Sequence, residues 1–367
     1  MRLAVTIRQA ALAATALSLL AATATTAAPA GAATWGVAYP PFQTMSNVPF
    51  APLQAVAPIS ATSAWAVGRD DGSMLAERWN GSTWSSVAVP SAPCAVTESD
   101  CQLTGVGADS ASDAIAVGNG ILNTYPTWTA APLAFHWSGA AWQQMTLPIG
   151  LAYTALEHVQ SFSPTDTWAV GVDASGSTEV ATALNWNGTT WTQAATPIST
   201  VNDLSINAIS GSSASDIWAV GQTATAGYRN RQFTSVVMHY NGSAWTQVAV
   251  PDSSGLLDVA ALSPTDAWAL AADGSVLNWN GSAWTVQTQL AEGNTVLAAL
   301  SPTDVWVGGV VSLTHYNGST WTATPIPTGI SALTGSASLA PGHVWFTGDY
   351  VTPADVTQPA VASTSGG

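Results

Sequence analysis

The chain of 367 residues contains no lysine and only six arginines, two of which, Arg2 and Arg8, fall in its first ten residues. Charged residues make up 7% of the chain, and 21 of them are acidic. A protein that binds nucleic acid needs clustered cations to displace the counterions of the phosphate backbone. The shortage of positive charge therefore argues against a nucleic-acid partner, and it disfavours anionic lipid surfaces for the same reason.

Long apolar runs are also scarce. Residues 10–22 form one, which follows Arg2 and Arg8 and precedes a small-residue stretch at 28–32. This run is shorter than the ~20 residues that a membrane-spanning helix needs, and its flanks are typical of a secretory signal peptide. We therefore expect residues 1–32 to be a signal peptide, an extracellular location and no membrane span. Removal of this segment leaves four arginines against 21 acidic residues, a formal net charge of −17.

Cysteine is nearly absent as well. Cys94 and Cys101 are the only two in the chain. In an exported protein, two cysteines this close together favour a local disulfide. A metal site needs more ligands than this stretch offers, so we expect neither a metal nor another cofactor.

What the sequence does contain is a repeat built from two phrases. The first reads Ser-x-[Ser/Thr]-Asp-x-Trp-Ala-Val-Gly, as at residues 163–171, and the second reads aromatic-Asn-Gly-x-x-Trp-Thr, as at residues 186–192. The anchor residues of the first phrase are Trp65, Ile115, Trp168, Trp218, Trp268, Trp306 and Trp345. Those of the second are Trp35, Trp84, Trp142, Trp191, Trp245, Trp284 and Trp321. A repeat of this length indicates a supersecondary unit that buries its apolar face only by stacking on its neighbours.

Each unit reads as four short strands. Ser-Pro-Thr-Asp, as at residues 163–166, predicts a tight turn between the first and second strands. Asn-Gly predicts a hairpin turn of type I′ between the third and fourth. Four strands in ~40–50 residues is the size of one propeller blade.

The two series of anchors are out of phase. The chain opens on a second phrase at Trp35 and closes on a first phrase at Trp345, so its two ends complement each other. Pairing them removes an exposed sheet edge. We predict an all-β fold over residues 33–350: a seven-bladed β-propeller of four-stranded antiparallel blades, closed by the N-terminal strand. Residues 351–367 read as a low-complexity tail or a partial strand of the last blade.

The paired phrases resemble those of secreted β-propeller repeat proteins of actinobacteria. The Gly-x-x-Trp hairpin is also distantly similar to the Asp-box turn of sialidase-like propellers, although Ser-x-Asp-x-Gly is not spelled out. The resemblance covers about residues 34–350. It implies a fold and leaves function open, because propellers host unrelated activities.

Repeat positions account for most residues that attract attention as candidate sites. Seventeen of the 18 tryptophans occupy them, which predicts packing between blades rather than chemistry. His136, His239 and His315 share one repeat position, so a structural role is favoured. His158 follows Glu157, and an acid–base pair is conceivable there, although a structural role is again favoured. The chain contains no Gly-x-Ser-x-Gly, His-Glu-x-x-His or phosphate-loop motif, and we favour a non-catalytic protein.

The insertions all fall in the loops between second and third strands and between blades, and these loops share one face of a propeller. They concentrate in the first four blades, and loops on a rigid scaffold are where binding usually resides. The residues that fall outside every repeat position predict the ligand-binding site: Tyr125, Trp128, Tyr228, Arg229 and Arg231, with Arg69 as a neighbour. Aromatic and arginine side chains suit sugar stacking and forked hydrogen bonds. We expect a carbohydrate or cell-envelope glycan as the ligand. A protein–protein scaffold and a sialidase-like glycosidase or lyase are the alternatives.

Overall fold

The computed structural model describes residues 34–40, 53–70, 73–91, 94, 100–124, 127–200, 203–225, 231–251, 254–310, 312–339, 342–351 and 357–365. The chain divides into two units, Met1–Ala32 and Ala33–Gly367, and all the described residues belong to the second. The expected signal peptide, residues 1–32, lies outside the described residues. The second unit is a seven-bladed β-propeller, and each blade has at least four antiparallel strands.

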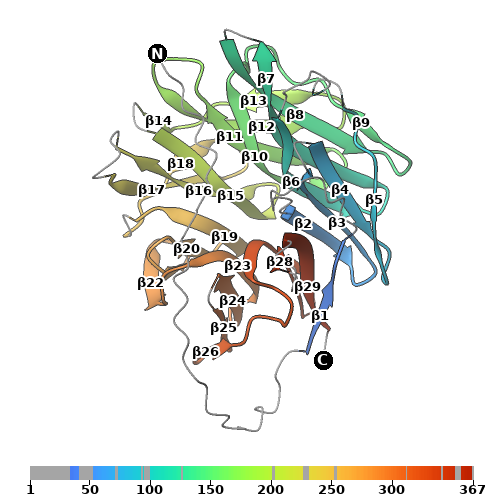
Figure 1. Ribbon diagram of the computed structural model, residues 1–367. Helices are drawn as coiled ribbons and strands as arrows, with labels where there is room; N and C mark the ends of the chain where they lie inside the picture. Colours follow the sequence, from blue (N-terminus) through green and yellow to red (C-terminus); the bar gives the residue numbers. More distant parts are fainter. Residues whose placement is uncertain are drawn as a thin grey trace. The chain divides into compact units, whose positions relative to one another are not determined.

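Six blades follow one another along the chain (Figure 1). Blade 1 contains β2 (Leu53–Ser60), β3 (Ser63–Asp70), β4 (Ser73–Trp79) and β5 (Trp84–Ser86); blade 2 contains β6 (Asp100–Ser110), β7 (Asp113–Thr124), β8 (Thr127–Trp137) and β9 (Trp142–Gln144). Blade 3 contains β10 (Thr154–Ser163), β11 (Asp166–Asp173), β12 (Glu179–Trp186) and β13 (Trp191–Ala194), with the short β14 (Ser199–Thr200) added; blade 4 contains β15 (Asp203–Ser213), β16 (Asp216–Ala224), β17 (Phe233–Tyr240) and β18 (Trp245–Gln247). Blade 5 contains β19 (Leu256–Ser263), β20 (Asp266–Ala271), β21 (Ser275–Trp279) and β22 (Trp284–Gln289); blade 6 contains β23 (Asn294–Ser301), β24 (Asp304–Gly309), β25 (Leu313–Tyr316) and β26 (Trp321–Thr324).

Blade 7 joins the two ends of the propeller unit and confirms the predicted closure. It contains β27 (Ala332–Leu339), β28 (His343–Val351) and β29 (Thr357–Ser365), and β1 (Thr34–Ala38) supplies its fourth strand. Trp35 pairs with Thr364 in this sheet. The first strands of successive blades contact one another around the ring, ending with β27 against β2.

The third strand of blade 7 is longer than the sequence indicated. Residues 351–367 read as a tail or a partial strand, yet β29 extends over nine residues and pairs with β28 on one side and β1 on the other. Ala360, Val361 and Ala362 are buried. Two paired neighbours and this apolar centre hold the strand, so the fold extends to Ser365.

Each first strand carries a bulge at the same place, and in blades 2, 4, 6 and 7 the side chain of the bulged residue links its blade to the next. In blade 2 the register shifts between Leu103 and Gly105, and the Thr104 hydroxyl donates to the carbonyl oxygen of Leu156 in blade 3 at 2.8 Å. Asn207, Thr295 and Thr334 donate in the same way to the first strand of the following blade. The bulge also brings the first-strand backbone close to the second strand. A Cβ added to Gly118 would lie 2.0 Å from the Gln102 carbonyl oxygen, so glycine is required at this position of blade 2.

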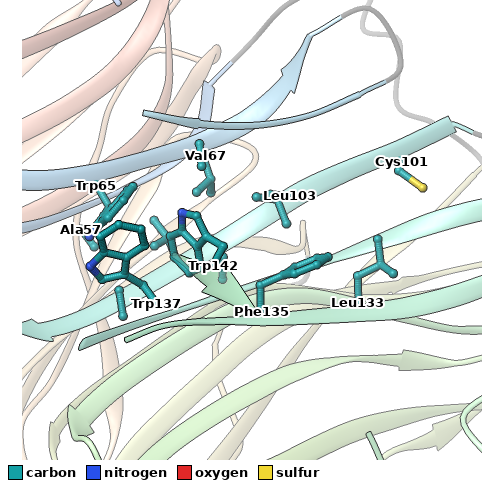
Figure 2. Close-up of a cluster of buried hydrophobic side chains, with 13 residues drawn as sticks. Ala57, Trp65, Val67, Cys101, Leu103, Leu133, Phe135, Trp137 and Trp142 are labelled. Atoms are coloured by element: carbon teal, nitrogen blue, oxygen red, sulfur yellow. The ribbon is translucent and has the colours of Figure 1, made fainter. Parts of the chain in front are cut away.

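Aromatic rings form the contact between blades, as expected for repeat tryptophans. The second-strand Trp65 of blade 1 lies between Trp137 and Trp142 of blade 2, with ring centroids 4.9 Å apart in both pairs. Figure 2 shows these three rings together in one buried cluster. The second-strand tryptophans of blades 3 to 7 contact aromatic residues of the following blade in the same way. We call this second-strand ring the wedge of an interface.

The Asn-Gly turns differ from the type I′ turn that the sequence indicated. Trp79 pairs with Trp84, so the loop contains four residues, and Gly81 has a φ of +95° while Asn80 does not have a positive φ. The Asn80 side-chain oxygen accepts the backbone N–H groups of the third and fourth loop residues, each at 3.0 Å. A side-chain cap therefore closes the turn in place of a second positive φ. The other four Asn-Gly turns have the same bonds.

The turn aspartates pair with one position of the third strand. The Nε2 atoms of His136, His239 and His315 lie 2.7–2.9 Å from the carboxylates of the turn Asp of the same blade. Asn185 and Asn278 donate to the turn Asp in their blades. The shared contact explains why both positions recur in the sequence.

Candidate functional site

The two ends of the blades differ in structure. The tight turns that join first to second and third to fourth strands lie on one end, which we call the tight-turn face. Loops between second and third strands and between blades lie on the other, the loop-bearing face. In blade 2 the pairing of β7 with β8 continues to Thr124 and Thr127, whereas in blade 6 the pairing of β24 with β25 ends at Gly308 and Leu313. The loop-bearing face is therefore extended over blade 2 and short over blade 6.

The predicted disulfide lies where the chain enters blade 2 on this face. Cys94 and Cys101 are bonded, with their Cα atoms 6.1 Å apart. Cys101 is fully buried near the start of β6 and pairs with Gly120 of β7. A Cβ on Gly120 would lie 2.6 Å from the Cys101 sulfur, so glycine leaves the space that the disulfide occupies. The bond ties the connection between blades 1 and 2 to the base of the extended hairpin.

A charged and aromatic group lies at the edge of the same face in blade 4. Arg231 precedes β17 and forms an ion pair with Asp203, the first residue of β15. Its guanidinium carbon lies 5.8 Å from the centroid of the Phe233 ring. Phe233 is 38% exposed, although most large apolar side chains of the propeller are buried. The ion pair holds the guanidinium over an aromatic ring that solvent can reach.

Glu179 borders this group from blade 3. One of its carboxylate oxygens accepts the backbone N–H of Leu204 in blade 4. Burial raises the pKa of the Glu179 carboxyl and the nearby Asp203 charge adds to this, while the Leu204 hydrogen bond and Arg231 oppose it. The two acids and the arginine thus join the ends of blades 3 and 4 on the loop-bearing face.

The structure describes only part of the site predicted from the sequence. Arg69 lies near the end of β3, and Arg231 precedes β17, so both belong to the loop-bearing face. Trp128 pairs with Asn123 in the extended hairpin, and its side chain lies outside the described residues, as do Tyr125, Tyr228 and Arg229. The site as a whole stays a prediction. Asp203 and Phe233 were missed, although both lie beside predicted insertions.

His158 and Asp258 lie half-buried on inner strands. Burial lowers the pKa of His158 to about 4, so its imidazole is neutral at pH 7. Asp258 accepts backbone N–H groups from Leu297 and Val259 and a hydroxyl from Ser336 of blade 7. Burial nevertheless raises its pKa to about 6. These bonds link blades 5, 6 and 7 at the inner strands, which is a structural role.

No group of three or more His, Cys, Asp or Glu side chains among the described residues could hold a metal ion. Within those same residues, no helix has the length and apolar character needed to cross a bilayer.

Comparisons with known proteins establish the fold. No protein-family model matches the chain, and no curated protein matches it. A structure of YCF48 bound to D1 peptide is similar, with a TM-score of 0.61 and 15% identity over 91% of this chain and 95% of that one. YCF48 from Cyanidioschyzon merolae has a TM-score of 0.57 and 15% identity over 91% and 98%. The WD40 β-propeller domain of Doa1 has a TM-score of 0.55 and 12% identity over 90% and 97%. At these identities the likeness concerns the propeller fold alone.

Proposed function

We propose that the chain is a secreted, non-catalytic binding module whose loop-bearing face binds carbohydrate, with cell-envelope glycan as the favoured ligand. The observation that carries this proposal is the Arg231 guanidinium fixed by Asp203 over the exposed ring of Phe233. The C–H face of a sugar ring stacks on an aromatic ring. A fixed guanidinium offers paired N–H donors to neighbouring hydroxyls. The two groups together provide an apolar contact and a polar contact at one place.

The composition of the chain supports the same ligand class. Only 7% of the residues are charged, so the surface is made mainly of Ser, Thr, Asn, Gln and Gly. Hydroxyl and amide groups both donate and accept hydrogen bonds, as sugar hydroxyls do. A polar surface with few charges, most of them negative, suits a neutral polyol better than it suits an anionic polymer.

A protein segment is the second candidate, and a specific observation favours it. The β7–β8 hairpin extends the loop-bearing face over blade 2, and exposed aromatic and arginine side chains are frequent energetic anchors of protein interfaces. The similar propeller YCF48 has been solved with a bound D1 peptide. For this chain the protein partner would be extracellular.

A glycan array followed by titration calorimetry tests the proposal on the exported protein. Phe233→Ala and Arg231→Ala should each weaken binding of the best array glycan by roughly tenfold, the factor that about 1.4 kcal/mol provides. Val310→Ala is the matched control, because Val310 is 54% exposed on the same face in blade 6, where the loop is short. It should leave binding unchanged. Binding that survives both test substitutions would contradict the assignment, and an array without hits, together with capture of a peptide ligand, would favour the second candidate.

A further inference from the structure

The interface between blades 2 and 3 lacks its wedge. Blade 2 has Ile115 at the position where the other six blades have Trp, and the Ala-Val-Gly residues that follow are unchanged. Ile115 is 1% exposed and packs with Trp191 in the same cluster. Trp186 and Trp191 of blade 3 contact each other at 5.7 Å, and among the described residues of blade 2 only the His136 ring contacts either of them, at 6.5 Å from Trp186.

A groove opens at this interface. Its volume is about 360 Å³, which falls within the range of small-molecule sites. Blade 2 contributes His136, Gln143 and Gln144, together with the residues that follow to Pro148. Blade 3 contributes Trp186, Thr189 and Thr190. The Trp186 indole N–H donates to the Pro164 carbonyl oxygen at 3.2 Å, and this bond holds the ring at the groove.

The missing wedge also changes which ring one histidine contacts. In blades 4 and 6 the histidine of the third strand stacks on the wedge of its own blade: His239 on Trp218 at 4.2 Å and His315 on Trp306 at 4.0 Å. His136 keeps the contact with its turn aspartate, Asp113, at 2.9 Å. It has no wedge to stack on, and its ring instead lies 6.5 Å from Trp186 and lines the groove.

The lining defines the chemistry of a ligand. The exposed Gln143, Gln144, Thr189 and Thr190 provide amide and hydroxyl groups that donate and accept hydrogen bonds. Trp186 provides an aromatic surface, and none of the described residues that line the groove is acidic, lysine or arginine. We propose that this groove is a binding site for a neutral sugar ring, separate from the loop-bearing face.

The location makes the two sites independent. Thr189 and Thr190 belong to the turn between β12 and β13, on the tight-turn face, whereas Arg231 and Phe233 lie at the loop-bearing end of blade 4. The inference therefore goes beyond the proposed function. If one proposed site does not bind sugar, the proposal for the other site still stands, and substitutions at each site test the two separately.

Restoring the wedge beside the groove is the most direct test. Ile115→Trp restores the residue of the other six blades, and in blades 1, 3 and 4 that Trp is followed by the same Ala-Val-Gly residues, so the variant should fold. Calorimetric titration of the whole exported chain with maltotetraose, cellotetraose and chitotetraose should detect binding of at least one of these neutral probes. Ile115→Trp should weaken that binding roughly tenfold or more, while circular dichroism and the unfolding midpoint confirm the fold.

Matched surface variants show whether binding depends on the groove itself. Gln144→Ala should weaken binding, and Gln247→Ala should not, because Gln247 occupies the same position in blade 4, at an interface that Trp218 fills. Phe233→Ala should also leave binding at the groove unchanged. Three results would overturn the proposal: no binding of any neutral tetrasaccharide, equal binding by Ile115→Trp, or loss of binding only with Phe233→Ala. Binding restricted to an anionic probe such as tetragalacturonate would overturn it as well.

Discussion

Two interfaces of the propeller, between blades 4 and 5 and between blades 2 and 3, are packed with different residues at the same second-strand position. Trp218 is fully buried between Trp279 and Trp284, at 4.9 and 5.1 Å, and His239 covers its other side. At the second interface Ile115 occupies the same place, and a groove remains. Both second strands keep the same register with their neighbours. The wedge therefore contributes stability to one interface without being needed to specify the blade.

The interface that closes the ring, between blades 7 and 1, adds a third case. Trp345 packs against Trp79 and Trp84, so the wedge is present. Glu77 is fully buried in blade 1, at the third-strand position where blades 3 and 5 have Leu184 and Leu277. One carboxylate oxygen accepts a hydrogen bond from Ser86, and the other has no partner among the described residues. This interface keeps its aromatic contact and buries an acid beside it.

Removing the closing strand should have the largest effect. Deletion of residues 33–40 removes β1, which pairs with β29, and Trp35, which lies 5.4 Å from Trp306. Loss of one buried aromatic side chain costs about 3–5 kcal/mol, and the deletion also exposes a sheet edge. We expect the free energy of unfolding to fall by more than that range and the urea-induced unfolding transition to broaden. Fluorescence and circular dichroism monitor this transition. A single sharp transition close to that of the full chain would contradict closure by β1.

Converting the filled interface into the open one should have the next largest effect. Trp218→Ile places the residue of blade 2 in blade 4, and it removes the contacts with Trp279, Trp284 and His239. Because the surrounding blades relax only partly, we expect a loss of roughly 2–4 kcal/mol in the free energy of unfolding. Denaturant titration measures it. A change below about 0.5 kcal/mol would mean that the wedge does little for stability.

Glu77→Leu should produce a smaller effect that depends on pH. Burial raises the pKa of the Glu77 carboxyl from 4.5 to about 7, and the nearby Asp70 adds to this while the Ser86 hydrogen bond opposes it. The folded protein thus binds more protons than the unfolded chain between these two values, and its free energy of unfolding falls as pH rises from about 4.5 to 7. Replacement of a buried charge by an apolar residue should stabilise the protein on the order of 1–3 kcal/mol at pH 8.

The gain from Glu77→Leu should shrink toward pH 4, where Glu77 is protonated in the folded state. Asp258 and Asp349, whose pKa values burial raises from 3.8 to about 6, give the remaining pH dependence the same sign. Unfolding curves of both proteins at pH 4, 6 and 8 provide the measurement, with Glu77→Gln as the variant closest in shape. A pH-independent gain would show that the Glu77 carboxyl does not titrate in this window.

The sequence predicted the parts of the fold that repeat. The order of the phrases at Trp35 and Trp345 was sufficient to predict closure by the N-terminal strand. The sequence did not predict the length of β29, because no Asn-Gly turn follows that strand. Its outer partner is β1, from the start of the chain, and not the fourth strand of a hairpin. The type I′ turn was wrong at Asn80 because the asparagine side chain, and not the backbone, satisfies the turn.

The candidate sites were harder to predict for a different reason. Ile115 stands out in the sequence as the one anchor of the first phrase that is not Trp. The groove depends on how Trp186 and Trp191 pack across the interface, and no local sequence pattern predicts that packing. Arg231 was predicted from its place outside the repeat. Its partners Asp203 and Phe233 come from two strands of blade 4, and their approach is a property of the folded sheet.

The central claim is that Ile115 leaves an unfilled repeat position that the fold does not need. The most direct measurement is the free energy of unfolding of Ile115→Trp beside the unchanged protein, by denaturant titration at pH 7. Filling a cavity of matching shape stabilises proteins by about 0.5–2 kcal/mol, so we expect equal or greater stability and an unchanged slope. A loss of more than about 1 kcal/mol would contradict the account, because it would show that the interface has repacked around isoleucine and has no room for the ring.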